Sequence, residues 1–193
     1  ADRTVDLGVA KYSDEFGLSV DFVNIENVIT QDGDDSITGN VDDNHLTAND
    51  GLDTLEGGAG DDTLDGGAGA DLALYQSGND IAVDLNEGVA TGEGTDTLIG
   101  IEDVTTASGD DTLTGNDEDN IFSANNGSDL LAGNGGNDHM YGGAGNDTVL
   151  AGNGNDLASG EGGYDTLGFD EGISGVTFSL AVSSAQETGN GSI

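Results

Sequence analysis

The sequence has 193 residues, of which 39 are acidic, 2 are basic and 35 are glycine, and its formal net charge is −37. Only 34% of the residues are hydrophobic and none is Trp, Pro or Cys, so the chain buries little apolar surface and forms neither disulfides nor thiolate metal sites. Two cationic side chains are too few to form a binding surface for nucleic acid, and no apolar run is long enough to insert into a membrane. The strongly negative net charge favours cations as partners.

The chain begins with a segment that carries no nonapeptide repeat. Within residues 1–29, the segment 18–22 alternates apolar and polar side chains with a period of two, which predicts a β-strand. We expect 1–29 to be a spacer or N-terminal cap.

Residues 30–74 form the first repeat block, five nonapeptides without a gap: TQDGDDSIT, GNVDDNHLT, ANDGLDTLE, GGAGDDTLD and GGAGADLAL. A spacer follows at 75–105, with a predicted strand at 81–85. The second block, 106–168, has seven nonapeptides, and 169–193 is predicted to be a further spacer or C-terminal cap with a strand at 176–180. The tetrapeptide at 25–28 recurs, nearly unchanged, at 101–104, which indicates an internal duplication.

Three positions of the nonapeptide are nearly constant. Position six is Asp in ten repeats and Asn in the other two, position four is Gly in ten repeats, and position eight is apolar throughout. We therefore predict a six-residue turn followed by a three-residue strand with one inward apolar side chain. Two such units make one coil of 18 residues.

The turns have the composition of a hard-cation site. Glycine permits the positive φ that curls backbone carbonyls inward, and the position-six Asp adds a carboxylate. Stacking two turns one coil apart would supply the six to eight oxygens that Ca²⁺ prefers, whereas Mg²⁺ keeps its waters. The predicted neighbours are Asp35–Asp53–Asp71 and Asn44–Asp62 in the first block, and Asp111–Asp129–Asp147–Asp165 and Asn120–Asp138–Asp156 in the second. Roughly 8 calcium ions would reduce the net charge to about −21, and binding would be coupled to folding.

The units at 57–65 and 142–150 fit G-G-x-G-x-D-x-U-x without change, and this repeat resembles the RTX (repeats-in-toxin) nonapeptide. The resemblance implies an all-β fold, a right-handed parallel β-roll (a β-solenoid) with two RTX blocks and β-rich spacers. It also implies bacterial export through a type I secretion channel, and calcium ligands from the carbonyls of turn positions one to four and from position six. The candidate metal-site residues are Gly33, Asp35, Asn44, Gly51, Asp53, Gly57, Gly58, Ala59, Gly60, Asp62, Gly66, Gly67, Ala68, Gly69, Asp71, Gly109, Asp111, Asn120, Gly127, Asp129, Gly133, Gly136, Asp138, Gly142, Gly143, Ala144, Gly145, Asp147, Gly152, Gly154, Asp156, Gly163 and Asp165.

The expected function is structural rather than enzymatic: a calcium-binding module of a secreted or cell-surface protein, of the adhesin, surface-layer or fibre type. Two alternatives stay open, a non-catalytic helper module of a secreted hydrolase or epimerase and a glycan-binding module. End-to-end association of copies is a further hypothesis. Most aromatic residues, Tyr12, Phe16, Phe22, Tyr75, Phe169 and Phe178, lie in the spacers, where we expect them to cap the rolls. His45 and His139 are predicted to face solvent, and acidic pairs such as Asp61–Asp62 are not predicted to be catalytic.

Overall fold

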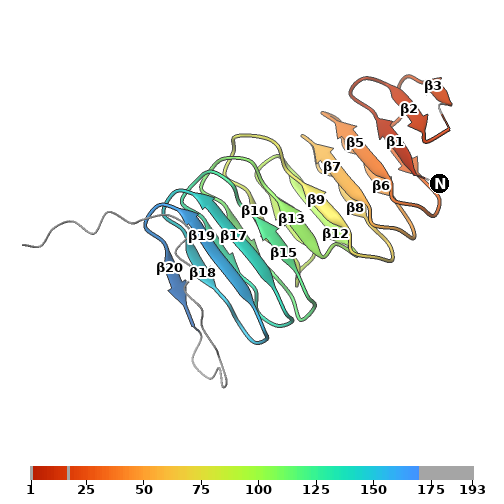
Figure 1. Cartoon of the computed structure of the whole chain (residues 1–193). Helices are drawn as coiled ribbons and strands as arrows, with labels where there is room; N and C mark the ends of the chain where they lie inside the picture. Colours follow the sequence, from red (N-terminus) through yellow and green to blue (C-terminus); the bar gives the residue numbers. More distant parts are fainter. Residues whose placement is uncertain (1, 17, 170–193) are drawn as a thin grey trace, which may run out of the picture.

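In the computed structural model, residues 2–16 and 18–169 are described, and within them the chain forms 20 β-strands and no helix. The strands build one elongated parallel β-solenoid of about 8 coils (Figure 1). The all-β solenoid expected from the repeats is therefore confirmed. Consistent with this, those same residues include no apolar helix that could cross a membrane.

Two ten-stranded sheets form the two faces of the solenoid. Sheet A contains, in spatial order, β3 (Ser19–Asp21), β2 (Lys11–Asp14), β1 (Arg3–Asp6), β5 (Ser36–Asn40), β7 (Thr54–Gly58), β9 (Leu72–Leu74), β13 (Asp103–Thr105), β15 (Ile121–Ser123), β17 (His139–Ala144) and β19 (Leu157–Gly162). Sheet B contains β4 (Asn27–Ile29), β6 (His45–Thr47), β8 (Thr63–Asp65), β12 (Thr95–Ile99), β11 (Val89–Thr91), β10 (Ala82–Asp84), β14 (Thr112–Thr114), β16 (Leu130–Ala132), β18 (Thr148–Leu150) and β20 (Thr166–Gly168).

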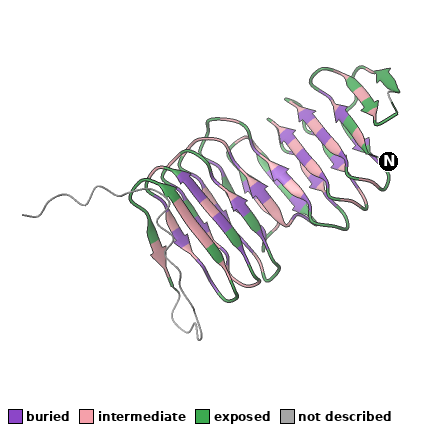
Figure 2. Ribbon diagram, viewed as in Figure 1, coloured by how far each residue is buried: buried purple, intermediate pink, exposed green. Residues whose placement is uncertain are grey.

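Each nonapeptide strand places its position-eight side chain in the core. In β6, Leu46 is fully buried between the exposed His45 and the half-buried Thr47, and it lies in register with Leu64 of the next coil. Figure 2 shows the resulting buried stripes running across both sheets. Ten of the twelve position-eight residues are buried, and Ala158 and Leu167 of the last coil are half-buried. The core is thus a narrow column with one apolar position-eight side chain per nonapeptide.

The segment 75–105 belongs to the same stack. Strands β10, β11 and β12 form an antiparallel meander inserted into sheet B, where β12 pairs in parallel with β8 and β10 pairs in parallel with β14. Strand β13 continues sheet A, with Val104 in register between Ala73 and Phe122. The two repeat blocks therefore share one core.

A second antiparallel meander, β1–β2–β3, ends sheet A at the N-terminal end of the solenoid. The strands predicted at 18–22 and 81–85 correspond to β3 and β10. The strand predicted at 176–180, and Phe178 with it, lies outside the described residues.

Candidate metal centre

The six-residue turns lie in two rows, one at the entrance to each sheet. The row leading into sheet A carries Asp35, Asp53, Asp71, Asn120, Asp138 and Asp156 at position six. The row leading into sheet B carries Asn44, Asp62, Asp111, Asp129, Asp147 and Asp165. Every position-six candidate falls in one of these rows.

The turn backbone has positive φ at two positions, where glycine is favoured. Position two has positive φ at Gly58, Gly67, Gly143 and Gly152, and at Asn49, Asn125 and Asn134, since Asn tolerates this region. Position four has positive φ at Gly33, Gly60, Gly69, Gly109, Gly127, Gly136, Gly145, Gly154 and Gly163. Gly51 also lies at position four, where its Cβ would overlap the Gly33 carbonyl.

Close approach restricts the remaining turn positions. A Cβ at position one, at Gly57, Gly66, Gly133 or Gly142, would overlap the carboxylate of the position-six Asp of the same turn. At position three, the amides of Ala59, Ala68 and Ala144 donate to position-two carbonyls of the preceding coil. In these four turns the carboxylate is therefore folded against the first residue of its own turn.

Replacing Gly67 with Ala tests this packing. Gly67 has φ +100°, and an added Cβ would overlap the backbone carbonyl of Asn49. Because both the conformation and the contact are unfavourable, Gly67→Ala should lower the free energy of unfolding in calcium by ~2 kcal/mol or more, measured by denaturant titration. Gly78→Ala is the control, because its Cβ would meet only the Ser108 Oγ at 3.5 Å. Equal stability of the two variants would show that position two of this turn accepts a side chain.

The position-six residues are linked along each row by a repeated hydrogen bond. The Asp35 amide donates to Asp53 Oδ1 at 2.6 Å, and the Asp53 amide donates to Asp71 Oδ1 at 2.8 Å. The same bond joins Asn44 to Asp62, Asp111 to Asp129, Asp129 to Asp147, Asp147 to Asp165, Asn120 to Asp138 and Asp138 to Asp156. The structure thus brings together each pair of neighbours expected from the spacing.

The second carboxylate oxygen of these residues is buried without a partner. It is Oδ2 of Asp53, Asp62, Asp71, Asp111, Asp129, Asp138 and Asp147, and each of these residues is at most 2% exposed. A buried unpaired carboxylate oxygen is costly, and a hard cation with oxygen ligands would remove that cost. Among residues 2–16 and 18–169, no three His, Cys, Asp or Glu side chains converge as a metal cluster, so backbone carbonyls would have to complete the coordination.

The same burial raises the pKa of the carboxyls. It raises the pKa of Asp53, Asp62, Asp129 and Asp138 to about 6, with neighbouring carboxylates adding to the effect and the amide hydrogen bond opposing it. Burial also raises the pKa of Asp71, Asp111 and Asp147. Without a cation, the rows therefore hold protons at a pH where ordinary Asp is ionised.

The two Asn turns differ from the Asp turns. Asn44 Oδ1 accepts the amide of Asn40 in its own turn, which leaves the buried Nδ2 without a partner. Asn120 Oδ1 accepts the amide of Asn116, and its Nδ2 donates to the Glu102 carbonyl at 2.8 Å. In both turns the side-chain oxygen already accepts a backbone amide of the same turn. Only backbone carbonyls are therefore left to bind a cation there. At the last coil, Asp156 is half-buried and Asp165 is exposed.

Two acidic residues of the spacer also belong to the rows, and the sequence analysis missed them. The Asp62 amide donates to Asp96 Oδ1 at 3.0 Å, and the Asp71 amide donates to Glu102 Oε2 at 2.9 Å. The segment 91–99 does carry Gly94, Asp96 and Leu98 at positions four, six and eight. It was missed because it stands outside the two uninterrupted runs.

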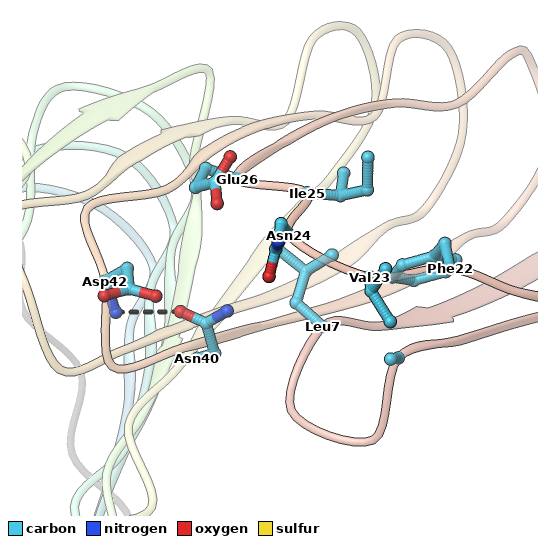
Figure 3. Close-up of a pocket in the computed structure, with 9 residues that line it drawn as sticks. Leu7, Phe22, Val23, Asn24, Ile25, Glu26, Asn40 and Asp42 are labelled. Carbon is cyan, nitrogen blue, oxygen red and sulfur yellow. Dashed lines mark hydrogen bonds between the residues drawn. The ribbon is translucent and has the colours of Figure 1, made fainter.

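Other candidate groups lie away from the rows. His45 and His139 are exposed, as expected for position seven. A cavity of 270 Å³ at the N-terminal end is lined by Leu7, Ala10, Phe22, Val23, Asn24, Ile25, Glu26, Asn40 and Asp42. In Figure 3, the Asp42 amide donates to Asn40 Oδ1, at 2.8 Å. None of the position-six residues lines this cavity, although Asn40 and Asp42 belong to the Asn44 turn.

Comparison with known proteins agrees with the repeat assignment. A family model described as the RTX calcium-binding nonapeptide repeat (4 copies) matches residues 25–55, 47–82, 98–131, 105–140 and 132–167. Together these matches cover both blocks and more than half of the chain. A search of curated proteins found no match.

Proposed function

The chain belongs to the family of RTX calcium-binding nonapeptide repeats, and we propose that it is a structural module that folds and becomes rigid when its turns bind calcium. One observation carries the proposal: seven buried Asp carboxylates direct an oxygen without a partner into turns walled by backbone. When bound there, calcium supplies the positive charge that these oxygens lack.

The ligand assignment follows the rows. Each pair of turns one coil apart would hold one ion, giving three pairs in 30–74 and five in 106–168, or about eight ions in all. The position-six Asp residues would bind through their free Oδ2, and positions one to four would contribute carbonyls. We assign only backbone carbonyls to the Asn44 and Asn120 turns, because their side-chain oxygens accept amides of their own turns.

The net charge of the module indicates the calcium concentration that it needs in order to fold. A chain with net charge −37 is destabilised by self-repulsion where calcium is scarce. Extracellular modules bind calcium with a Kd of roughly 10⁻⁴–10⁻³ M, so sites of that affinity load only outside the cell. We therefore place the module in a secreted or cell-surface bacterial protein, with no catalytic role of its own.

The described aromatic residues do not favour the glycan-binding alternative. Tyr75 is buried, and Tyr12 and Phe22 pack against the core. Phe16, Tyr164 and Phe169 are exposed, but they belong to different ends or turns of the solenoid. A flat platform for stacking a sugar would need several of these rings side by side.

Asp129→Asn tests the ligand assignment. The amide oxygen can still accept the Asp111 N–H, which the carboxylate now binds at 2.7 Å, while the amide nitrogen replaces the unpartnered Oδ2. We expect at least one calcium ion fewer per chain at a given free calcium concentration, counted by native mass spectrometry. Folding should also require several-fold more calcium, because Asp129 faces two turn pairs.

The matched control is Asp50→Asn, which makes the same change of charge at an exposed position of a turn. It should leave both the number of ions and the calcium midpoint of folding unchanged. If Asp129→Asn behaved like this control, the position-six carboxylates would not be the ligands.

A further inference from the structure

Seven buried position-six carboxylates have an Oδ2 atom without a partner. In two others, Asp96 and Asp35, Oδ2 contacts a side chain of the protein itself. Asp96 Oδ2 accepts the hydroxyl of Tyr75 at 3.2 Å. Asp35 Oδ2 lies 3.5 Å from the guanidinium of Arg3, which also donates to the Gln31 carbonyl at 3.2 Å. Arg3 thus contacts a carboxylate and a turn carbonyl, the two kinds of oxygen that a cation would use.

The backbone around Asp96 is that of an ordinary pair of turns. The Asp62 amide donates to Asp96 Oδ1, the Thr97 amide donates to the Asp62 carbonyl at 2.8 Å, and the Gly60 amide donates to the Glu93 carbonyl at 3.2 Å. A Cβ at Gly94 would overlap the Gly60 carbonyl, as at position four of other stacked turns. By its backbone alone, the Asp62–Asp96 pair would be one more cation site.

Tyr75 is held firmly in this pair of turns. It directly follows Leu74, the last residue of the first block, and its amide donates to the Thr105 carbonyl at 2.9 Å. The side chain is only 2% exposed. Burial, with the Asp96 carboxylate beside it, raises the pKa of Tyr75 above its usual range. The hydroxyl therefore stays protonated at neutral pH and can donate its hydrogen bond.

The Asp62–Asp96 pair lies at a break in the row of turns that leads into sheet B. On its other side, β12 pairs with the antiparallel β11, which is not preceded by a nonapeptide turn. The row then resumes at Asp111, whose Oδ1 accepts the amide of Ile81, an apolar residue at the position-six place. The inserted meander therefore interrupts the row of carboxylates leading into sheet B.

We propose that Tyr75 closes the Asp62–Asp96 turn pair to calcium, because its hydroxyl occupies the carboxylate oxygen that an ion would need. The coil that joins the two blocks is then held by a hydrogen bond within the chain, whereas its neighbours depend on calcium. Arg3 plays the corresponding part for Asp35 at the first turn. This inference rests on the proposed function, since it assumes that the other pairs take ions.

Tyr75→Phe tests the closure. Removing the hydroxyl frees Asp96 Oδ2 and leaves the ring in place, so native mass spectrometry of the full chain with calcium alone should count one more ion than in the wild type. Tyr141→Phe, in β17, removes a hydroxyl from a half-buried ring away from Asp96 and should leave the count unchanged. An unchanged count in Tyr75→Phe overturns the proposal, and so does a lower count, which would make the hydroxyl a ligand.

Asp96→Asn gives a second test that does not depend on how well Tyr75→Phe folds. The amide oxygen can still accept the Asp62 N–H, and the amide nitrogen can donate to the Tyr75 hydroxyl. We expect the wild-type number of ions in Asp96→Asn and a lower number in Asp129→Asn. If both variants lose ions, Tyr75 does not close the pair, although the proposed function stands. If Asp129→Asn loses none, the proposed function itself fails.

Discussion

Removing calcium with EDTA at neutral pH is expected to abolish the β-sheet signal of the chain in far-UV circular dichroism. The chain has 39 acidic and 2 basic residues, and its core is a narrow column to which each nonapeptide contributes one apolar position-eight side chain. With free calcium at ten times Kd, linkage contributes about 1.4 kcal/mol per site, or on the order of 11 kcal/mol for about eight independent sites. That contribution is as large as the total stability of an ordinary domain, roughly 5–15 kcal/mol.

The measurement is a calcium titration of the EDTA-treated chain, with sheet content followed by circular dichroism. The signal should return cooperatively, because neighbouring turns share position-six residues such as Asp53 and Asp129. Magnesium at the same ionic strength is the control and should restore much less sheet, because Mg²⁺ dehydrates reluctantly and requires a small octahedral site. Equal sheet content in EDTA and in calcium would show that the core suffices without the ion.

The parts of the fold that repeat were predictable, since one rule applies at every nonapeptide. Leu46 and Leu64 face the core because each follows its position-six residue by two. The neighbours along each row were predictable for the same reason, because parallel strands of equal length place turns n and n+2 one above the other. The Asp53 amide accordingly meets Asp71 Oδ1.

The parts that were missed depend on contacts between segments of unequal length. Asp96 joins Asp62 across 34 residues instead of 18, because strands β10 and β11 precede Asp96 in the sequence and lengthen this coil. Glu102 reaches the Asp71 amide with a longer side chain than the repeat uses. Tyr75 belongs to no repeat position, and its role appears only when its hydroxyl is seen on Asp96. A periodic pattern contains no information on such insertions, whereas the packing of the coils determines them.

Acid should partly replace calcium in stabilising the solenoid. Burial raises the pKa of Asp53, Asp62, Asp129 and Asp138 from 3.8 to about 6. The folded chain without calcium therefore binds protons more tightly than the unfolded chain does. Its stability is greatest below about pH 4, falls as the pH rises through about 6, and is lowest at neutral pH. In EDTA, sheet content should increase as the pH is lowered from 7 to 5, before the exposed carboxyls titrate near pH 4.

Calcium affinity should change in the opposite direction, because protons and calcium compete for the same oxygens. The calcium midpoint of folding should rise as the pH is lowered from 7 to 5. A midpoint independent of pH in this range, or a transition in EDTA only near pH 4, would show that general charge repulsion and not the buried carboxyls controls folding.

Asp129→Asn separates the two effects, because the amide resembles the protonated carboxyl and cannot ionise. Burial raises the pKa of Asp129 from 3.8 to about 6, so the ionised form destabilises the solenoid without calcium. In EDTA at pH 7, Asp129→Asn should therefore have more sheet than the wild type, although it binds calcium less well. Asp50→Asn removes an exposed charge and should change neither property. A buried carboxylate that destabilises the empty turn and binds the ion in the filled one makes folding conditional on calcium. A sheet content of Asp129→Asn in EDTA no higher than that of the wild type would show that the carboxylate does not destabilise the empty turn.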